Sequence, residues 1–365
     1  MGECWHIIVS CRPNNGCQYY YHTEHRRLTV ERQIVLSGIR ATGKLHLGNY
    51  VGALKNFVEL SRDEAKKCFY FIANLHTLTT HTNPSELRAS VKDIVRDFLA
   101  CGLDPKVATI YAQSSVPEIT ELSWILSCIA PLNLLTIMPH FKEKRDKLNE
   151  SGITENAGLL TYPILMAADI LCVKSELVPV GDDQAPHVEF ARELAKKFND
   201  MFGELFPMPK FFGGAGLRLP GLDNRGKMSK SEVSSVIYLD DSPDAVWKKL
   251  KVAVTDPQRV KRHDPGNPDV CNIFTFHHAL ETPVGDITRI TRECKSGEIG
   301  CIECKEILAK VVNDILRPIN ERREQIIGLG ASYIDEVMHD GGLRARKVIQ
   351  QTVAEAKELV GVPLY

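Results

Sequence analysis

The sequence has almost no net charge, no internal repeat and no low-complexity tract. Its 45 Lys and Arg residues balance 46 Asp and Glu residues, which gives a formal net charge of −1 at pH 7. A chain with this balance contacts nucleic acid through local basic patches, because its overall field attracts neither sign of charge. The absence of repeats excludes a solenoid or another repeat architecture.

A disulfide framework is lacking as well. The 11 cysteines are odd in number, and most of them are scattered through segments with helical or strand patterns. This usage favours a reducing compartment, and we expect a cytoplasmic protein. The cysteines that we interpret as structural or incidental are Cys4, Cys11, Cys17, Cys68, Cys101, Cys128 and Cys172.

Long apolar runs are few, and none predicts a membrane contact. The run at residues 7–9 is too short for the core of a signal peptide. Residues 122–141 contain no Asp, Glu, Lys or Arg and reach the length of a membrane span, but Pro131 and Pro139 interrupt them. We therefore expect a buried helix or a subunit interface in this stretch.

What is present predicts an α/β fold with a Rossmann-like, doubly wound parallel sheet and a C-terminal α-helical domain. Short apolar runs predict buried strands at residues 34–36, 69–73 and 108–112, and amphipathic helices separate them. We expect three parts. They are an N-terminal extension at 1–33, an α/β domain at 34–240 and a helical domain at 241–365.

The stretch at residues 37–50 follows the first predicted strand and leads into a predicted helix. Backbone N–H groups at such a junction, together with the positive end of the helix dipole, are suited to bind phosphate. Because Lys44 and His46 stand beside this turn, we interpret it as a phosphate-binding site. Ligands of doubly wound sheets bind at this edge, where the strands end.

Two motifs make the prediction more specific. The sequence HLGN at 46–49 and the sequence KMSKS at 227–231 resemble the two signatures of class I aminoacyl-tRNA synthetases. When an amino-acid carboxylate attacks the α-phosphate of ATP, negative charge builds on the phosphate oxygens, and lysines and a histidine can stabilise it. The resemblance implies Mg²⁺ held mainly by the phosphates. It implies that the catalytic residues are His46, Asn49, Lys227 and Lys230.

The same resemblance assigns further residues to ATP. They are Arg40, Ala41, Thr42, Gly48, Asn49, Gly181, Asp182, Asp183, Lys227, Met228, Ser229, Lys230 and Ser231. Lys142 and Lys144 match a basic pair that reaches the phosphates in relatives. The alternative for that pair is a solvated helix face.

Residues 162–169 and 178–184 resemble the internal motifs of tryptophanyl-tRNA synthetases, and this resemblance runs from about residue 34 to the C-terminus. In that family the residue matching Asp169 accepts the indole N–H. A carboxylate suits indole, which has one donor and no acceptor, and it penalises phenylalanine, which would leave it unpaired. Leu36 and Asn74 depart from the common pattern, which has an aromatic residue and an acid there. The implied tryptophan-binding residues are His76, Tyr162, Met166, Asp169, Val178, Val180 and Gln184.

A second constellation is formed by Cys271, Cys294, Cys301 and Cys304, with the spacing C-x22-C-x6-C-x2-C. Four thiolates suit either tetrahedral zinc or an iron–sulfur cluster, and ligand chemistry does not separate the two. The spacing resembles a bacterial subset of tryptophanyl-tRNA synthetases that carry a [4Fe–4S] cluster. Only this resemblance selects iron, so zinc is the second choice.

Basic residues lie near these cysteines in the sequence. Residues 248–262 hold six basic side chains against one acid, and Arg289, Arg292, Lys295 and Lys305 follow. Such a strip suits the phosphates and bases of a tRNA anticodon, although it is also typical of a solvated helix face. The leading prediction is ATP-dependent activation of L-tryptophan to tryptophanyl-adenylate and its transfer to tRNA(Trp) by a homodimer.

Three alternatives remain. A tyrosyl-tRNA synthetase shares the fold and the mechanism. A non-catalytic tRNA-binding paralogue would be expected to have lost His46, Lys227 or Lys230, and all three are present. A small-molecule nucleotidyltransferase with a similar turn would not need the C-terminal helices and cysteines.

Overall fold

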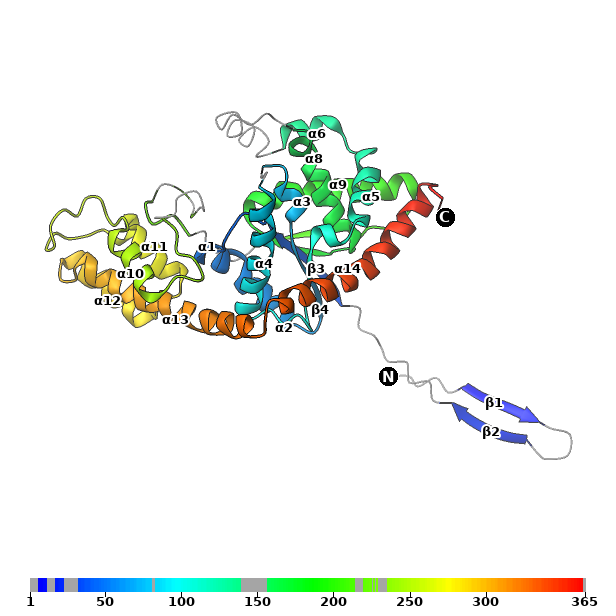
Figure 1. Ribbon diagram of the computed structural model, residues 1–365, viewed down its shortest axis with the longest axis horizontal. Coiled ribbons are helices and arrows are strands. Elements are labelled where there is room, and N and C mark those ends of the chain that lie inside the picture. The colour runs from blue at the N-terminus through cyan, green and yellow to red at the C-terminus, as the bar shows by residue number, and fades with distance from the viewer. Residues whose placement is uncertain are drawn as a thin grey trace. The chain divides into compact units, whose positions relative to one another are not determined.

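The structure, a computed structural model, describes residues 32–80, 83–138, 156–213, 219–224, 226, 228 and 235–363, and the backbone of 6–11 and 17–22. The chain divides into two compact units, Met1–Arg32 and Gln33–Tyr365. In the smaller unit, β1 (His6–Cys11) and β2 (Cys17–His22) pair as an antiparallel hairpin (Figure 1). This hairpin falls in the segment for which the sequence predicts an N-terminal extension.

The larger unit is built around a five-stranded parallel sheet with the order β5-β4-β3-β6-β7. Because β3 is central, the chain extends the sheet from it in one direction through β4 and β5 and in the other through β6 and β7. The predicted α/β class with a doubly wound parallel sheet is therefore confirmed. The strands are β3 (Gln33–Ile39), β4 (Lys66–Ile72), β5 (Thr109–Ala112), β6 (Leu177–Val180) and β7 (Lys210–Gly213).

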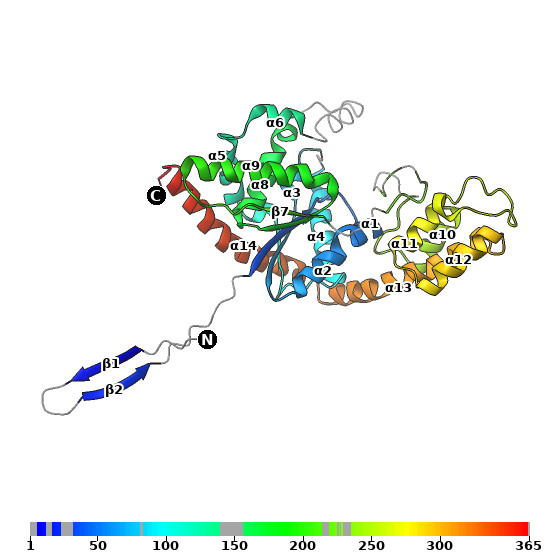
Figure 2. The same cartoon turned by 180° about the vertical axis from the view of Figure 1, so that it is seen from behind.

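Helices cover both faces of this sheet and continue into a helical C-terminal region (Figures 1 and 2). Those of the sheet region are α1 (Leu47–Asn49), α2 (Lys55–Arg62), α3 (Asn74–Thr77), α4 (Pro84–Ala100), α5 (Glu118–Ser127), α6 (Leu132–Ile137), α8 (Ala157–Cys172) and α9 (Ala185–Phe202). Those of the C-terminal region are α10 (Pro243–Val252), α11 (Asn272–Ala279), α12 (Val284–Ser296), α13 (Cys301–Gly328) and α14 (Ser332–Leu359).

The strands bury both faces because successive side chains point to opposite sides of the sheet. Val35 and Tyr70 belong to a core that includes apolar residues of α2 and α4. Their neighbours Leu36 and Phe69 belong to a second core, which includes residues of α5, α8 and α9. The continuous apolar runs that predicted buried strands thus supply one residue to each core in turn.

Local chemistry fixes the start of α4 as the sequence predicts. The side chain of Asn83 accepts hydrogen bonds from the backbone N–H groups of Ser85 and Glu86, at 3.1 and 3.4 Å. Pro84 occupies the first turn of the helix, where its missing N–H is not needed. This cap positions α4, whose last turns lie close to the candidate site described below.

The uncharged stretch 122–141 does not form one buried helix. Its described part contains the end of α5 and then α6, with Pro131 as the N-cap of α6. Trp124, Leu132 and Ile137 are 71%, 66% and 72% exposed. In the described part of the chain, no helix is long and apolar enough to cross a membrane.

Two long helices connect the C-terminal region to the sheet region. The helix α13 contacts both α10 and α4, and α14 contacts β5, α5 and α8. Each buries an apolar stripe, which includes Leu308 and Val312 of α13 and Ile349 and Val353 of α14. The residues from Gln33 onward consequently form one compact unit, in which α13 is shared between the C-terminal helices and α4.

Candidate active site

His46 begins a helical stretch at residues 47–62, which consists of α1, a π-helical segment (Tyr50–Leu54) and α2. The backbone N–H of Asn49 donates to His46 Nδ1 at 3.3 Å, and the N–H of His46 donates to Asn49 Oδ1 at 3.1 Å. This reciprocal pair is a capping box, so the predicted helix start at His46 is confirmed. Since Nδ1 accepts, the proton of the neutral ring lies on Nε2, which makes Nε2 the donor.

Gly48 allows a close approach at this turn. A Cβ atom at position 48 would lie 3.0 Å from His46 Nδ1 and 3.6 Å from the Cβ of Met228. Met228 is buried, and its backbone N–H donates to the carbonyl of Leu219 at 2.9 Å. The second predicted motif therefore lies against the first at this point. Its residues Lys227, Ser229, Lys230 and Ser231 lie outside the described residues, as do Lys142 and Lys144.

Backbone pairing holds the two segments together. The N–H of Leu47 donates to the carbonyl of Ile237 at 2.8 Å, and the N–H of Leu239 donates to the carbonyl of Leu45 at 3.1 Å. An ion pair joins Lys44 Nζ to Asp240 Oδ2 at 2.5 Å and raises the pKa of Lys44. The segment that follows residue 234 is thus hydrogen-bonded to the residues directly before and after His46.

The backbone of the turn before His46 differs from the predicted phosphate cradle. The N–H of Ala41 donates to Thr77 Oγ1 at 3.0 Å, and the N–H of Gly43 donates to Ser90 Oγ at 3.1 Å. The N–H of Thr42 donates to the carbonyl of Arg40 at 2.9 Å. The expectation of open N–H groups is therefore wrong for these residues, because α3, α4 and the turn itself already satisfy them.

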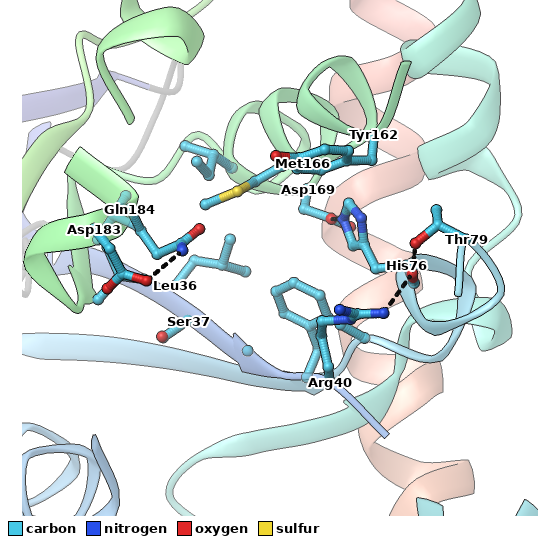
Figure 3. Close-up of a pocket in the computed structure, with 16 residues that line it drawn as sticks. Leu36, Ser37, Arg40, His76, Thr79, Tyr162, Met166, Asp169, Asp183 and Gln184 are labelled. Carbon is cyan, nitrogen blue, oxygen red and sulfur yellow. Dashed lines mark hydrogen bonds and ion pairs between the residues drawn. The ribbon is translucent and has the colours of Figure 1, made fainter. Parts of the chain in front are cut away.

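A pocket of about 440 Å³ opens beside this turn, at the carboxyl ends of β3 and β6 (Figure 3). This volume lies within the usual range for small-molecule sites, about 300–1,000 Å³. The pocket brings together every residue that the sequence analysis assigned to tryptophan, and it adds Leu36, Ser37, Arg40 and Phe71. The predicted residues in its wall are His76, Tyr162, Met166, Asp169, Val178, Val180 and Gln184.

Asp169, on α8, is fully buried in the pocket wall. Its Oδ2 lies 3.0 Å from His76 Nε2, and Gln113 Nε2 donates to both carboxylate oxygens, at 3.0 and 2.8 Å. Burial raises the pKa of Asp169, while the hydrogen bond from His76 and its charge act to lower it. The carboxylate is thereby held in one orientation, as an acceptor for a donor that enters the pocket.

Sequence reasoning missed Gln113. It lies in a short 3₁₀ turn (Gln113–Ser115) directly after β5. The only available signal was a polar residue at the carboxyl end of a predicted strand, where ligands of such sheets bind. Asn74 acts on the same turn, because its Nδ2 donates to Ser114 Oγ at 2.7 Å and its Oδ1 accepts from the N–H of Ser114 at 3.0 Å. Asn74 therefore positions Gln113 from outside the pocket.

Tyr162 is buried in the pocket and hydrogen-bonded to a second residue that sequence reasoning missed. Its hydroxyl lies 2.8 Å from His187 Nε2, on α9. Burial raises the pKa of Tyr162 to about 12, so the hydroxyl is neutral at physiological pH. This contact sets the direction of the Tyr162 ring on the side of the pocket opposite to Arg40 (Figure 3).

Arg40 enters the pocket from the end of β3. Its Nη2 donates to Thr80 Oγ1 at 2.6 Å and lies 3.5 Å from the carbonyl oxygen of His76, while its buried Nε has no hydrogen-bond partner among the residues that the structure describes. Burial lowers the pKa of Arg40 from its usual value. A bound anion would supply the missing partner.

The turn at Asp182–Gln184 closes the pocket at the end of β6. Asp183 and Gln184 line the pocket, and Gln184 Nε2 donates to Asp183 Oδ2 at 3.1 Å. A Cβ atom at position 181 would lie 2.8 Å from Asp183 Oδ1, so Gly181 permits this turn. Of the other described residues assigned to ATP, Arg40 also lines the pocket, whereas Ala41, Thr42, Gly48, Asn49 and Met228 lie at the His46 turn and do not.

The four clustered cysteines lie where three helices meet. Cys271 caps α11, Cys294 lies on α12, and Cys301 and Cys304 lie in the first turn of α13. Among the described residues, no group of His, Cys, Asp or Glu is arranged to hold a metal ion. The donor set nevertheless fits a thiolate-bound centre. Burial, and then the other three cysteines, raise the pKa of Cys304 to about 12, so binding of a metal centre by this thiol would release its proton.

Two of the basic residues near these cysteines bind groups of the protein itself. Lys305 is buried, and its Nζ donates to the carbonyls of Lys251 and Ala253 at 2.8 and 2.7 Å, where α10 ends. The expectation that Lys305 contacts RNA is therefore wrong, because the free carbonyls at a helix end attract a cation. Arg289 is paired with Asp286 and Glu293, at 3.8 and 3.4 Å. Lys248, Lys251, Lys261 and Arg262 are exposed.

The parallel sheet, the His46 turn at the end of its central strand and the adjoining pocket define a Rossmann-type nucleotide-binding protein. Comparison with known proteins agrees, since the family described as tRNA synthetases class I (W and Y) matches residues 29–317. A tryptophan–tRNA ligase of Thermotoga maritima is 41% identical over 329 residues, which cover 90% of this chain and 99% of that protein. One of Deinococcus radiodurans is 39% identical over 330 residues, covering 90% and 98%.

Solved structures give the same result. The tryptophanyl-tRNA synthetase of Campylobacter jejuni, complexed with ADP and tryptophan, has a TM-score of 0.78 at 32% identity and covers 90% of this chain and 100% of that chain. That of Mycoplasma pneumoniae has a TM-score of 0.76 at 32% identity and covers 91% and 98%. The chain therefore belongs to the class I synthetase family for tryptophan and tyrosine, and within it to the tryptophanyl-tRNA synthetases.

Proposed function

We propose that this chain uses ATP to activate L-tryptophan as tryptophanyl-adenylate and then transfers the amino acid to tRNA(Trp). The single observation that carries the choice of substrate is the buried carboxylate of Asp169 in the pocket wall, held by His76 and Gln113. A fixed acceptor selects an indole N–H, and a substrate without that donor lacks a hydrogen bond to a charged group, which is worth about 1.5–3 kcal/mol.

In the proposed reaction, the tryptophan carboxylate attacks the α-phosphate of ATP, and pyrophosphate leaves. His46 donates from Nε2 to the phosphate oxygens, because its Nδ1 is occupied by the N–H of Asn49. Arg40 supplies an unpaired buried Nε to an anionic group of the substrates. Lys227 and Lys230 neutralise the leaving pyrophosphate, and Mg²⁺ is held mainly by the phosphates.

ATP–pyrophosphate exchange tests this function. We expect exchange that depends on L-tryptophan, with L-phenylalanine at least about a hundredfold less effective, because phenylalanine has no donor for the buried carboxylate. Exchange with tyrosine and not with tryptophan would replace this proposal with the tyrosine-specific enzyme. No exchange with either amino acid, but binding of tRNA, would favour a non-catalytic paralogue.

We further propose that residues 241–365 form the anticodon-binding domain, following the catalytic domain at 34–240. The exposed Lys248, Lys251, Lys261 and Arg262 support this role, because they leave positive charge at the surface of α10 and the loop after it. Glutamate at these positions should weaken tRNA charging and its salt dependence while pyrophosphate exchange stays unchanged.

Three exposed apolar side chains lie in the stretch at residues 122–141. We propose a homodimer through the exposed apolar side chains of Trp124, Leu132 and Ile137, because a monomer rarely exposes such a group without a partner. Sedimentation of the wild type and of a Trp124→Asp variant would test this, with monomers expected only for the variant.

A role in translation and the free cysteines together suggest a cytoplasmic location.

For the four cysteines we propose a [4Fe–4S] cluster, with zinc as the second choice. The chemistry of the donor set and the meeting of α11, α12 and α13 at this point support it. A bound centre would supply cross-links between these helices. No step of the adenylation reaction is assigned to it.

A further inference from the structure

Asn272, the first residue of α11, is a buried amide that the proposed chemistry does not use. It is 2% exposed, and its Nδ2 donates to the carbonyls of Gly221 and Leu222 at 2.9 and 3.3 Å. Its Oδ1 is buried and has no hydrogen-bond partner in the described part of the chain. Burying an amide with an unpaired oxygen costs free energy that an apolar side chain of similar size would avoid, so its presence calls for another explanation.

The backbone that Asn272 holds is joined to described residues on both sides of the KMSKS motif. The N–H of Gly221 donates at 2.8 Å to the carbonyl of Gly226, which directly precedes the motif. The N–H of Leu222 donates at 2.9 Å to the carbonyl of Ser235, which lies after it. Two residues therefore fix the positions from which the chain enters and leaves the motif, and one amide binds the carbonyls of both.

The same segment lies against the His46 turn. The N–H of Met228, inside the motif, donates to the carbonyl of Leu219 at 2.9 Å. The Cβ of Met228 is 3.6 Å from the place that a Cβ would take at Gly48. Apolar packing adds to these contacts, because one core contains residues of the His46 turn, the segment before the motif and α11. They are Leu47, Leu219, Leu222, Met228, Ile273 and Phe276.

A second contact holds the same carbonyl from another helix. The N–H of Val254, just after α10, donates to the carbonyl of Leu222 at 2.9 Å. Lys305 of α13 holds this segment in turn, since its Nζ donates to the carbonyls of Lys251 and Ala253 at 2.8 and 2.7 Å. The carbonyl of Leu222 is thus held by α11 directly and by α13 through the lysine.

We propose that Asn272 is a positioning residue for the adenylation step, because it fixes the backbone at Gly221 and Leu222 and with it both described sides of the KMSKS motif. Lys305 supports the same backbone through Val254. This inference rests on the proposed function. It gives α11 a task in the ATP half of the site, although the helix lies in the C-terminal region and contributes no residue to the pocket.

Thr282 offers a matched control in the same helical region. It is buried, and its Oγ1 lies 2.9 Å from Nδ1 of His277, a residue of α11. This contact does not include residues 221 and 222. Thr282→Val should therefore weaken the packing around α11, through the loss of a buried hydrogen bond, without moving the KMSKS motif.

The test compares Asn272→Leu, Lys305→Met and Thr282→Val in the full-length enzyme, purified anaerobically. Pyrophosphate exchange gives kcat and KM for ATP, and equilibrium dialysis gives Kd for tryptophan. We expect Asn272→Leu to lower kcat by about 10- to 100-fold, since a misplacement of about 1 Å can cost that much. KM for ATP should change by less than about threefold, because the lysines of the motif act on charge that develops in the transition state.

The other readouts separate positioning from a general loss of stability. Kd for tryptophan should stay within about twofold in Asn272→Leu, since residues 219–228 do not line the pocket. Lys305→Met should lower kcat by about three- to tenfold, because it acts through one more contact. Thr282→Val should lower the melting temperature and leave kcat within about twofold of wild type. The metal content of each variant should equal that of wild type.

Three results would overturn the inference. They are unchanged kcat in Asn272→Leu, an equal loss of kcat in Thr282→Val, and a loss of kcat that is matched by a loss of metal, which would assign the effect to the cysteines. If Asn272→Leu does not fold, unchanged kcat in Lys305→Met overturns the inference and a selective loss there supports it. Wild-type enzyme that is inactive with tryptophan would instead contradict the proposed function, and the same comparison can then be made with the amino acid that is activated.

Discussion

Gln113 Nε2 donates to both carboxylate oxygens of Asp169, at 3.0 and 2.8 Å, while His76 Nε2 contacts Oδ2 of the same group at 3.0 Å. The carboxylate that chooses the substrate is therefore oriented by two partners from the carboxyl ends of β4 and β5. Neither partner lies near Asp169 in the sequence. The parallel sheet therefore brings His76 and Gln113 to the carboxylate that selects the substrate.

Asp169→Asn should reduce selectivity for tryptophan. The amide offers one acceptor in place of two charged oxygens, and His76 and Gln113 compete for it. We expect KM for tryptophan to rise by about 10- to 100-fold, the effect of about 1–3 kcal/mol, with KM for ATP within about twofold. Pyrophosphate exchange measures both. Asp200→Asn, at an exposed position of α9, is the control, and equal effects in the two variants would contradict the role of Asp169.

Gln113→Leu should have a related but smaller effect. It removes the donor that holds both oxygens and leaves His76 as the remaining partner of Asp169. We expect KM for tryptophan to rise by about tenfold, a typical loss for a residue that orients a binding group. The exposed Gln325→Leu, on α13, provides the control. A Gln113→Leu enzyme with wild-type KM for tryptophan would show that His76 alone suffices.

Gly48→Ala should impair the ATP half of the site. The new Cβ would lie 3.0 Å from His46 Nδ1, so the imidazole ring must shift. We expect kcat in pyrophosphate exchange to fall by about 10- to 100-fold without a change in Kd for tryptophan. Gly52→Ala lies in the same helical stretch, where a Cβ meets nothing within 4 Å, and it should be active and slightly more stable. Equal activity of the two variants would argue against a role for the His46 ring.

Removal of the proposed cluster should separate the two half-reactions. Anaerobically purified protein should contain iron and sulfide and show the absorption of a cluster, whereas zinc without sulfide would select the second choice. After chelation or oxidation, tRNA charging should fall more than pyrophosphate exchange, because the four cysteines lie among the C-terminal helices. Equal loss of both activities would point to a general role in folding, and absence of any metal would contradict the proposal.

The elements of the sheet could be predicted because their signals are local. The cap at Asn83 and the apolar runs of β3 and β4 depend only on neighbouring residues, and the structure confirms them. The stretch 122–141 was harder to interpret. Its uncharged sequence is compatible with one buried helix, but Pro131 divides it and Trp124 points to solvent.

Part of the candidate site could also be predicted, because some of its residues stand in motifs formed by neighbouring residues. His46, Asp169 and the cysteines stand in motifs that a reader can recognise along the chain. Gln113 and His187 stand in no motif, because their importance comes from the strand or helix that places them next to Asp169 or Tyr162. The paired N–H groups of Ala41 and Gly43 belong to this class too, since their partners lie on other elements.

The sequence by itself determined the class of fold, the family and the types of side chain that the reaction needs, because periodicity and motifs are properties of neighbouring residues. Only the tertiary structure decided how those side chains are held. Asp97 shows the difference most clearly. In the sequence it is one acid on an amphipathic helix, and in the fold it is a buried carboxylate of α4 that is paired with Arg323 of α13.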